Sequence, residues 1–502
     1  MNIAKAASLM RARMVSTDAG GGELLGREIA GYAIDSRRLA PDELFFALSP
    51  EDYARHCFTG KFGEDAHRFV PQALKSGAVA VVARATRVEA DPGLLALGNS
   101  LLLVEDCIEA LQHLAHGVLR EWGKTVIEIT GSAGKTTTKD LTSHVLQAAG
   151  RRVLRSQKNF NSELGLPLSV LQMESAGRSP AQYDTAVLEM GMSMAGELTQ
   201  LCHIAPPDIA VELSVLPVHL EFLGTIENIA AAKSELIKGL KPGGTAILNA
   251  DDERVAAMRE MHAGPVLTFG LETQADVMAT EIEGVRLGLT RFRLHTPLGE
   301  AVAELPMPGR HNLSNALAAA AVATCFEIAP AVIGRALREA TVSEMRGQVL
   351  KFADGFTAVD DTYNSNPGAL LGMVRTVTEG VPTRDRTAER TIVIAGEMLE
   401  LGPESAALHR ETGSEIARLK VDQLWGIRGH ARELVEGARE AGMDAGRIKF
   451  FETVEEAAAA LRSEVREGDL ILVKGSRGVR TDKVIEALRE RFALAGGSEQ
   501  GM

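Results

Sequence analysis

The chain has 502 residues, of which 45% are hydrophobic and 24% charged, and its formal net charge is −13 at pH 7. This length is too great for one hydrophobic core, and at ~150 residues per domain it predicts about three domains. The acidic balance argues against general affinity for nucleic acid or anionic membranes, and no apolar run approaches the ~20 residues of a membrane-spanning helix.

We assign residues 1–120 to a small N-terminal α/β domain. Two stretches, "GYAIDSRRLAPDELFFAL" and "VPQALKSGAVAVVA", are typical of short strands and one helix. Within the second stretch, the small and apolar residues from Ala78 to Ala83 predict a buried strand.

Residues 121–341 form the predicted central domain, in which apolar strands alternate with helical stretches. This alternation is typical of a parallel sheet with helices on both faces. Between residues 279 and 308 apolar and basic residues alternate in "RFRL", and "TPLG" predicts a turn, so we expect antiparallel strands there. The alanine-rich "NALAAAAVATCF" then predicts a closely packed helix.

Residues 342–502 form the predicted C-terminal domain. The stretches "RTIVIAG", "DQLWGI" and "DLILVKG" are buried strands separated by helical segments, which indicates a second doubly wound, Rossmann-like unit. The predicted fold class is therefore α/β in three domains: a small N-terminal domain, a central P-loop domain with a parallel sheet, and a Rossmann-like C-terminal domain.

The stretch "VIEITGSAGKTTTKDL" predicts a strand over 126–130, a glycine loop, and a helix that begins at Lys135. Glycines let successive N–H groups point at phosphate oxygens, and the helix dipole favours the negative charge. Lys135 would neutralise the β- and γ-phosphates, and the Thr136 hydroxyl would hold Mg²⁺. The predicted nucleotide loop comprises Gly131, Ser132, Ala133, Gly134, Lys135, Thr136 and Thr137.

The loop has the short form G-x-x-G-K-T, because Ile129 stands where the longer phosphate-loop motif has its first glycine. The alternative is a glycine-rich turn between a strand and a helix, with Lys135 in solvent. Mg²⁺ also needs a carboxylate, and "DTAVLEMG" offers Glu189 at the end of an apolar strand. Without the phosphate loop, Glu189 would be interpreted as a solvated strand end.

Two further residues gain meaning only from their neighbours in "VHLEFLGTIENIAAAKSEL". Taken alone, His219 would be interpreted as a structural histidine and Lys233 as a solvated lysine. Lys233 lies on a predicted helix whose Ile229, Leu236 and Ile237 are spaced to face a core.

Taken together, these motifs resemble the Mur ligase family, whose members form amide bonds with ATP in peptidoglycan precursor synthesis. The resemblance spans almost the whole chain and depends on the order of "TGSAGKTT", "NFNSELGLPLSVL", "LEMG", "HLEFLG", "AAAKSE", "LNADD", "GRHNLSNALAAA", "MRGQ", "DDTYNSNP", "GEMLELGPES" and "LVKGSRGVR". Within the family, "DDTYNSNPGAL" and "GEMLELG" are most like the member that adds D-alanyl-D-alanine to UDP-N-acetylmuramoyl tripeptide.

The resemblance implies a reaction and two cofactors, ATP and Mg²⁺. ATP phosphorylates the terminal carboxylate of the tripeptide, and the amine of D-Ala-D-Ala attacks the acyl phosphate and releases phosphate. The resemblance places the first of two Mg²⁺ ions on Thr136 and Glu189, and the second beside His219 and Lys233. Lys233 matches the lysine that is carbamylated by CO₂ in the family, and Lys135, His219 and Lys233 are the predicted catalytic residues.

The same resemblance implies binding roles for other residues. Asn249, His311, Asn312 and Asn315 would surround the nucleotide, Arg346 would reach the phosphates, and Asp361 the ribose. Ser36 and Arg37 would contact the UDP-sugar, Asn159 and Asn161 would line the acceptor and phosphate cleft, and Asn364, Asn366, Ser476 and Arg477 would serve the peptide or dipeptide. Helix caps, turns and polar loops are the alternatives for these residues.

Two loops depart from the family pattern. Residues 49–70 are longer and altered, and keep only His67 in an equivalent place. Before His219 the family tends to have small residues and an asparagine, whereas this chain has Ser214, Leu216 and Val218, which are bulkier at two positions. Contacts to the uracil or diphosphate in the first loop therefore do not follow from the resemblance.

We expect a cytoplasmic monomer. The four cysteines, Cys57, Cys107, Cys202 and Cys325, form no CxxC pair, and the first residues lack the apolar core of a secretory signal. The alternatives to a D-Ala-D-Ala-adding ligase are the sibling that adds the third, diamino, amino acid, a folate-polyglutamate ligase, a nucleotide-binding regulatory protein and a kinase with a glycine-rich loop. The sequence does not distinguish diaminopimelate from lysine in the tripeptide.

Overall fold

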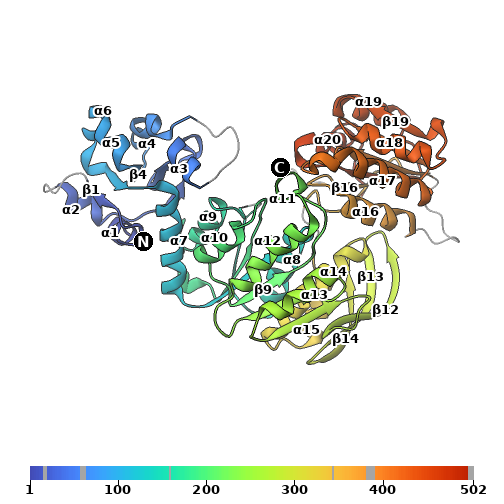
Figure 1. Ribbon diagram of the computed structural model, residues 1–502, viewed down its shortest axis with the longest axis horizontal. Helices are drawn as coiled ribbons and strands as arrows, with labels where there is room; N and C mark the ends of the chain where they lie inside the picture. The colour runs from blue at the N-terminus through green and yellow to red at the C-terminus, as the bar shows by residue number, and fades with distance from the viewer. Residues whose placement is uncertain (15–19, 57–63, 158–159, 342–343, 380–389, 496–502) are drawn as a thin grey trace.

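The structure, a computed structural model, describes residues 1–14, 20–56, 64–157, 160–341, 344–379 and 390–495. Three β-sheets, each with helices packed on it, follow one another along the chain and along the longest axis of the molecule (Figure 1). The predicted fold class, α/β in three units, is confirmed. The sheets span residues 13–104, 125–305 and 348–474, whereas the domain limits at residues 120 and 341 stay predictions.

The N-terminal unit contains a five-stranded sheet in the order β1-β5-β4-β3-β2, parallel except for β1. Its strands are β1 (Arg13–Met14), β2 (Gly31–Ala33), β3 (Glu43–Ala47), β4 (Ala80–Arg84) and β5 (Leu101–Val104). Its helices are α1 (Ile3–Met10), α2 (Gly20–Leu25), α3 (Pro50–Arg55), α4 (Val70–Lys75), α5 (Ala85–Ala90), α6 (Pro92–Leu95) and α7 (Cys107–Trp122).

The strand predicted from Ala78 begins two residues later, at Ala80. The end of α4 explains the difference. Gly77 has a φ of 101°, its N–H bonds to Leu74 O at 3.1 Å, and Ala78 N–H bonds to Ala73 O at 3.0 Å. This pair of bonds closes the helix in a Schellman motif, so Ala78 belongs to the helix end and not to the strand.

The central unit contains a nine-stranded sheet in the order β14-β13-β12-β11-β10-β9-β6-β8-β7. Its strands are β6 (Thr125–Thr130), β7 (Val153–Arg155), β8 (Thr185–Glu189), β9 (Ile209–Glu212), β10 (Thr245–Asn249), β11 (Val266–Gly270), β12 (Val277–Arg286), β13 (Leu289–Thr296) and β14 (Gly299–Leu305). The pairs from β7 to β12 are parallel, and β12, β13 and β14 pair antiparallel, so the predicted antiparallel segment is confirmed.

Helices cover both faces of this sheet because its strands alternate their apolar side chains between two cores. Ile127 and Ile129 of β6 belong to one cluster with α14, whereas Val126 belongs to another with α10 and α12. The helices of the unit are α8 (Lys135–Ala148), α9 (Gly165–Leu171), α10 (Glu197–Ile204), α11 (Leu220–Leu223), α12 (Ile226–Lys238), α13 (Glu253–Ala257), α14 (Arg310–Cys325) and α15 (Pro330–Arg338). The predicted alanine-rich helix is α14, which packs against α8.

The C-terminal unit contains a six-stranded sheet in the order β15-β16-β20-β17-β18-β19, parallel except for β15. Its strands are β15 (Gln348–Lys351), β16 (Thr357–Asp361), β17 (Arg390–Gly396), β18 (Gln423–Ile427), β19 (Ile448–Phe451) and β20 (Asp469–Lys474). Its helices are α16 (Pro367–Glu379), α17 (Ser405–Arg418), α18 (Ala431–Glu440), α19 (Val454–Glu464) and α20 (Asp482–Arg491). The three predicted strands are β17, β18 and β20, and the Rossmann-like architecture is confirmed.

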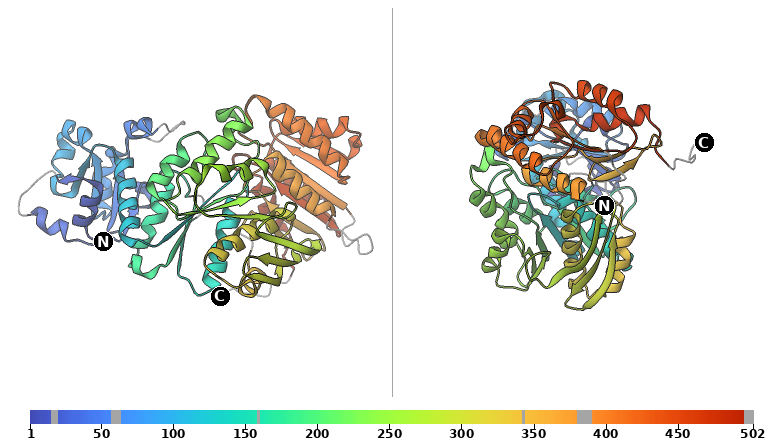
Figure 2. Two further views of the ribbon diagram at one scale, coloured as in Figure 1. Left: turned by 60° about the horizontal axis from the view of Figure 1, so that its bottom comes forward. Right: turned by 90° about the vertical axis from the view of Figure 1, so that its right-hand side faces the viewer.

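The central unit lies between the other two, as Figure 1 and the left view of Figure 2 show. It shares one apolar core with the N-terminal unit, because a single cluster runs from Ile3 of α1 through α7 to Met258. The C-terminal unit has two clusters of its own, one on each face of its sheet. Among the described residues, no helix is both long enough and apolar enough to cross a membrane.

Candidate active site

The glycine loop joins β6 to α8 as predicted, and its two glycines are required by the packing around them. Gly131 and Gly134 have φ values of 152° and 86°. A Cβ on Gly134 would lie 2.3 Å from Asn315 Oδ1, and a Cβ on Gly131 would lie 2.7 Å from the Leu213 Cβ. Only glycine fits both positions, which brings the loop close against β9 and α14.

The first turn of α8 faces the cleft, where its N–H groups have no partner within the helix. Lys135 Nζ donates to Gly131 O at 2.7 Å, so the lysine side chain curls over the loop. Ser214, two residues beyond the end of β9, holds the loop in place, because its carbonyl accepts from Ser132 N at 2.8 Å and its hydroxyl from Ala133 N at 3.2 Å. The helix N-terminus and the ammonium group together form an anion-binding surface.

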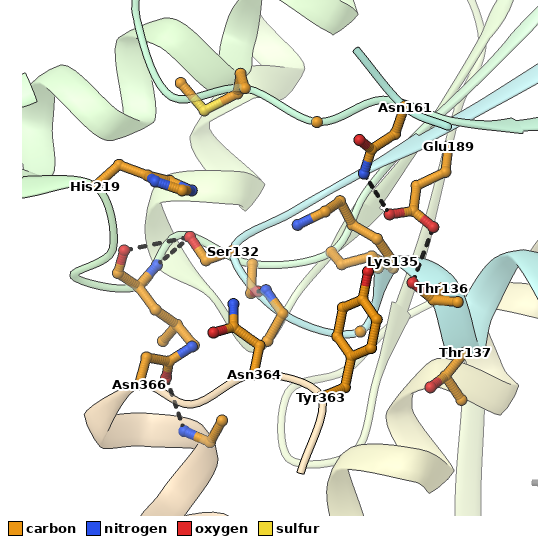
Figure 3. A pocket seen from close by; sticks show the side chains of 18 of the residues that line it. Ser132, Lys135, Thr136, Thr137, Asn161, Glu189, His219, Tyr363, Asn364 and Asn366 are labelled. Atoms are coloured by element: carbon orange, nitrogen blue, oxygen red, sulfur yellow. Dashed lines mark hydrogen bonds between the residues drawn. The ribbon is translucent and has the colours of Figure 1, made fainter. Parts of the chain in front are cut away.

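A chain of hydrogen bonds runs across the loop at Thr136. The Thr136 hydroxyl donates to Glu189 Oε2 at 2.9 Å, and Asn161 Nδ2 donates to Glu189 Oε1 at 2.8 Å. Arg346 of the C-terminal unit donates through Nη2 to the same Thr136 oxygen at 3.2 Å and stacks 3.8 Å from the centre of the Tyr363 ring. Figure 3 shows Asn161, Glu189 and Thr136 in a row, with Lys135 beside them.

This group fits a magnesium ion by the chemistry of its donors. Mg²⁺ prefers oxygen ligands and is commonly held by one or two carboxylates together with substrate phosphates and water. Thr136 and Glu189 supply two such oxygens next to the phosphate loop. The described residues contain no group of three or more His, Cys, Asp and Glu side chains that could hold a metal by themselves, so the remaining ligands would come from nucleotide and water.

Lys233 of α12 and Glu212 at the end of β9 are both buried and attract one another electrostatically. Their exposed fractions are 2% and 0%, so the interpretation of Lys233 as a solvated lysine is wrong. Neither carboxyl oxygen of Glu212 has a hydrogen-bond partner among the described residues. Burial raises the pKa of Glu212 to about 8, against the attraction of Lys233. Burial also lowers the pKa of Lys233 to about 8, against the attraction of Glu212.

The predicted nucleotide residues of the central unit lie together. Asn249, at the end of β10, donates to Leu213 O at 2.8 Å. Asn312 donates to Pro308 O at 2.7 Å, and Asn315 accepts from the Thr138 hydroxyl at 3.2 Å. These three asparagines therefore fix turns and the contact between α14 and α8, whereas His311 in the first turn of α14 is exposed to the cleft.

The C-terminal unit presents Asp361 and Lys474 at the ends of two adjacent strands, β16 and β20. Lys474 Nζ lies 2.5 Å from Asp361 Oδ2 and 2.9 Å from Asn364 O, and Lys474 is only 4% exposed. Asn366 Oδ1 accepts from Ala369 N at 2.9 Å and so caps the start of α16. Open parallel sheets bind ligands at this edge, where the strand order reverses.

His219 stands opposite the phosphate loop, on the turn before α11. Its ring reaches into the pocket from the side opposite Glu189 and Thr136 (Figure 3). His219 Nδ1 lies 2.6 Å from Oε2 of Glu400, which comes from the C-terminal unit. The neighbouring His219 lowers the pKa of the Glu400 carboxyl.

The N-terminal unit reaches the cleft through His56, on the altered loop. His56 Nε2 lies 3.2 Å from Asp106 Oδ1, and Nδ1 lies 3.1 Å from Oε2 of Glu163 in the central unit. Burial lowers the pKa of His56, but its contacts with Asp106 and Glu163 outweigh burial and raise the pKa to about 9. His67 is buried away from the cleft, where its Nε2 accepts from Arg84 N at 2.9 Å.

A cleft of about 800 Å³ connects these groups. The predicted site residues that line it are Ser132, Ala133, Gly134, Lys135, Thr136, Thr137, Asn161, Glu189, His219, Asn249, His311, Asn312, Asn315, Arg346, Asp361, Asn364 and Asn366. Gly131 and Lys233 lie behind its wall, and Ser36, Arg37, Ser476 and Arg477 lie outside it. Asn159 is outside the described residues.

Among the residues that line the cleft, His56, Glu163, Ser214, Glu400 and Lys474 have contacts that the sequence motifs do not assign. Lys474 ends an apolar strand as Glu189 does, so the rule of strand ends could have indicated it. The positions of His56, Glu163 and Glu400 at the site depend on contacts between units, and no local sequence pattern predicts such contacts.

Arg37, a predicted contact residue for the UDP-sugar, is paired with Asp35 of the same turn. Its guanidinium donates to Asp35 through Nε at 2.9 Å and Nη2 at 2.8 Å, and its side chain is 86% exposed. A solvent-exposed ion pair contributes little free energy, so a ligand could displace Asp35 from Arg37 at small cost.

Comparison with known proteins gives the class to which this arrangement belongs. The profile of the Mur ligase middle domain matches residues 129–323, and that of the Mur ligase glutamate ligase domain matches residues 345–477. The first match contains the phosphate loop, Glu189, His219 and Lys233, and the second contains Arg346, Asp361 and Lys474. This chain belongs to the Mur ligase family.

Three relatives define the part of the family that the chain resembles. The Bacillus subtilis UDP-N-acetylmuramoyl-tripeptide–D-alanyl-D-alanine ligase is 33% identical over 462 residues, which cover 92% of this chain and 93% of the relative. The crystal structure of MurF from Acinetobacter baumannii matches with a TM-score of 0.78 at 28% identity, over 92% of this chain and 94% of that one. MurF ligase from Thermotoga maritima in complex with ADP matches with a TM-score of 0.76 at 28% identity, over 93% and 98%.

Proposed function

We propose that this chain joins D-alanyl-D-alanine to UDP-N-acetylmuramoyl tripeptide, with ATP converted to ADP and phosphate, in peptidoglycan precursor synthesis. The observation that carries the proposal is the group formed by Lys135 and Thr136 at the phosphate loop and Glu189 at the end of β8, in a cleft lined by all three units. Relatives at about one-third identity along the whole chain, which carry the name of this activity, support the choice of substrates.

The chemistry explains why a nucleotide loop belongs in an amide-forming enzyme. A carboxylate resists attack by an amine, because the attack would have to expel oxide. Transfer of the γ-phosphoryl group to the tripeptide carboxylate breaks the bond to the β-phosphate oxygen, forms an acyl phosphate and releases ADP. The amine of the dipeptide then attacks the carbonyl carbon, loses a proton and expels phosphate, so atoms and charge balance.

Lys135 and the first turn of α8 would hold the β- and γ-phosphates, and Arg346 would meet them from the C-terminal unit. Thr136 and Glu189 would hold a first Mg²⁺, which when bound offsets the negative charge that gathers between carboxylate and triphosphate. His219 would contribute to a second ion. Because Arg346 comes from the other unit, ATP would be clamped between the two, and closure would accompany catalysis.

Lys233 is proposed to act as a carbamate, the product of its amine and CO₂. Only the neutral amine adds CO₂, and burial favours that form by lowering the lysine pKa to about 8. Burial raises the pKa of the nearby Glu212 and so favours its neutral form, which would not repel a carbamate. Undiminished activity of a Lys233→Ala variant would contradict this role.

The remaining predicted residues take binding roles in the proposal. His311 and Asn249 would lie on the nucleotide side with Asn312 and Asn315, Asp361 would reach the ribose, and Asn161, Asn364 and Asn366 would border the peptide. Ser36 and Arg37 would contact the UDP-sugar on the N-terminal unit, and Ser476 and Arg477 would act near the dipeptide. The cytoplasmic location, the monomeric state and the domain limits stay predictions.

The function is tested by mass spectrometry of the product and by phosphate release. UDP-N-acetylmuramoyl tripeptides that end in lysine or in diaminopimelate are each mixed with ATP, Mg²⁺ and D-Ala-D-Ala. We expect phosphate release that depends on D-Ala-D-Ala, and a product whose mass exceeds that of the tripeptide substrate by D-Ala-D-Ala less one water. No phosphate should be released when glutamate, lysine or diaminopimelate replaces the dipeptide. Lys135→Ala should lower the rate by about 10²–10³-fold, because it removes a positive charge from the transferring phosphate.

The sibling activity, addition of the third amino acid, is the runner-up. It predicts phosphate release with UDP-N-acetylmuramoyl dipeptide and a free diamino acid, and none with D-Ala-D-Ala. That outcome, or a Lys135→Ala protein with undiminished turnover, would overturn the proposal.

A further inference from the structure

One carboxylate on the wall of the cleft, that of Glu163, takes no part in the phosphate and metal chemistry proposed above. Glu163 lies in the turn before α9, two residues after Asn161, and its side chain lines the cleft with 14% of its surface exposed. Among the described residues its carboxylate makes one polar contact, from Oε2 to His56 Nδ1 at 3.1 Å. The other oxygen, Oε1, is therefore available to a ligand.

The turn that carries Glu163 is fixed by its neighbours. Gln112 of α7 donates through Nε2 to Glu163 O at 3.4 Å, and Gln200 of α10 donates to Gln112 Oε1 at 3.0 Å. A Cβ on Gly165 would lie 2.6 Å from Phe160 Cα, so the chain is closely packed where the turn enters the helix. No described side chain caps the start of α9, which means that the Glu163 carboxylate is not used for that purpose.

The charged side chains next to Glu163 include more carboxylates than cations. His56 is shared between Glu163 and the buried Asp106, whose Oδ1 lies 3.2 Å from Nε2. Arg84 is shared in turn between Asp106, at 3.3 Å, and the buried Asp52, at 2.6 Å. Even when His56 is protonated, these three carboxylates meet only two cations.

One further cation, Arg55, does not change this balance. It lies 4.0 Å from Asp106 Oδ2 and 3.9 Å from Glu109 Oε2, so it adds one positive and one negative charge. Asp106 is buried, whereas Glu163 lines the cleft, and a ligand can therefore reach the excess negative charge at Glu163. Such a wall favours a cationic group on the ligand.

The proposed substrate has a cation at a suitable distance. The carboxylate that receives the phosphoryl group belongs to the third residue of the tripeptide, a diamino acid, and would lie beside Lys135. Asn161 borders the same place, because it bonds to Glu189 next to Thr136 (Figure 3). The Cα atoms of Asn161 and Glu163 are at most ~7 Å apart, and a lysine side chain holds its ammonium about 6 Å from Cα. The ammonium is therefore within reach of Glu163 while the carboxylate faces the phosphates.

We propose that Glu163 binds the side-chain ammonium of the third residue of the tripeptide, through the oxygen that His56 leaves free. The inference deepens the proposed function and rests on it. Lysine and diaminopimelate both carry this ammonium, so the contact selects diamino acids as a class and does not distinguish the two. A third residue without the second amine would leave the carboxylate without its ligand.

The test compares tripeptides that differ only in this amine. One pair of UDP-N-acetylmuramoyl tripeptides ends in lysine or norleucine, and the other ends in diaminopimelate or 2-aminopimelate. Phosphate release with ATP, Mg²⁺ and D-Ala-D-Ala gives kcat/KM for each peptide. We expect the wild type to favour the diamino acid by about 10–100-fold, the effect of a hydrogen bond between charged groups. In Glu163→Gln this preference should disappear, because only the diamino peptides lose kcat/KM.

The matched control is Glu197→Gln, which removes the same charge from another part of the cleft wall. The Glu197 Oε2 accepts from Ser193 N at 2.6 Å and from Met194 N at 3.2 Å, and a glutamine oxygen can keep these bonds. Glu197→Gln should keep the wild-type preference. Loss of the preference in Glu197→Gln would assign it to general charge or to the other carboxylate, and would overturn the inference.

A second variant and a second readout complete the test. Glu163→Asp keeps the charge but withdraws it by one methylene, so we expect an intermediate preference. Equilibrium binding of each pair of peptides without ATP should show the same order of preference as turnover. A preference that is unchanged in both Glu163 variants, whatever their absolute rates, would overturn the inference, as would a wild type that uses both members of each pair equally. A wild type that is inactive with all four peptides would instead overturn the proposed function, and this inference with it.

Discussion

The two boundaries of the central unit are built differently, although a histidine–glutamate contact spans each. At the N-terminal boundary, His56 meets Glu163 beside a continuous apolar core. At the C-terminal boundary, His219 meets Glu400, and among the described hydrophobic residues of the central unit only Leu287 packs against either C-terminal cluster. Apolar burial joins the first pair of units, and polar groups of the cleft join the second.

This difference indicates which boundary moves. Separating the N-terminal and central units would expose a shared core, which costs about 25 cal/mol for each Å² of apolar surface. Separating the C-terminal unit would break contacts such as those of Arg346 and Glu400, which nucleotide and water can replace. Interfaces of this polar kind usually permit domain motion, so the opening of the cleft belongs to the C-terminal boundary.

The largest effect should follow from Arg346→Ala, which removes the guanidinium that bridges the polar boundary at Thr136. We expect kcat/KM to fall by about 10²–10³-fold, because a cation aimed at the transferring phosphate is lost. The free energy of unfolding should change little, since the side chain is only half-buried. Steady-state phosphate release measures the first quantity and urea denaturation the second.

The matched control is Arg375→Ala, which removes the same charge from an exposed position on α16. It should leave both quantities unchanged. Equal losses in the two variants would mean that general charge, and not the contact with Thr136, matters at this boundary.

The next effect concerns the shared core. Leu114 of α7 is fully buried in the cluster that spans the N-terminal and central units. Leu114→Ala should lower the free energy of unfolding by about 2–5 kcal/mol, the usual cost of such a cavity. Calorimetry should show the two units unfolding together at a lower temperature, with the C-terminal transition unmoved.

Leu472→Ala is the corresponding change in β20, where Leu472 is fully buried in a C-terminal cluster. It should lower the C-terminal transition alone. If either variant shifted every transition equally, the contrast between the two boundaries would be wrong.

The smallest effect is a dependence on pH at the N-terminal boundary. The folded pKa of His56 is about 9, above the ~6.5 of a free histidine, so the protonated ring stabilises the fold. This stabilisation is complete below pH ~6.5 and is lost as the pH rises through 9. We expect a loss of about 1–3 kcal/mol between these values, measured by urea denaturation at several pH values.

His56→Gln should lack this slope, because its amide stays neutral across the range. The matched control is His295→Gln in β13 of the central unit, which should keep the wild-type dependence of stability on pH. A wild-type stability that does not fall between pH 6.5 and 9 would contradict the assignment of a charged His56 at this contact.

The sequence predicts the strands, loop and helix that carry the site better than it predicts the contacts between units. The strand, glycine loop and helix from residues 125 to 148 follow from short-range chemistry, and Gly134 has the positive φ that such loops need. Glu189 follows from the rule that strand ends meet at one edge of a parallel sheet. These features depend on residues that are close together in the chain.

The contacts between units could not be predicted in this way. His56 and Glu163 are 107 residues apart in the chain, and nothing near either residue indicates the other. Lys233 looked solvated because a lysine on an amphipathic helix usually is, and its burial depends on how α12 packs against β9. Such outcomes depend on the assembled tertiary structure, which local periodicity does not contain.

The hydroxyl of Thr136 has a consequence for how ligands would enter the cleft. It donates to Glu189 and accepts from Arg346, so a single oxygen bonds both a carboxylate and a guanidinium that come from two units. In the proposed mechanism, a Mg²⁺ ion bound to this oxygen and to Glu189 would leave the guanidinium without its acceptor, and the triphosphate would offer new acceptors. Ligand entry would therefore exchange one set of hydrogen-bond partners for another and leave neither Glu189 nor Arg346 without a partner.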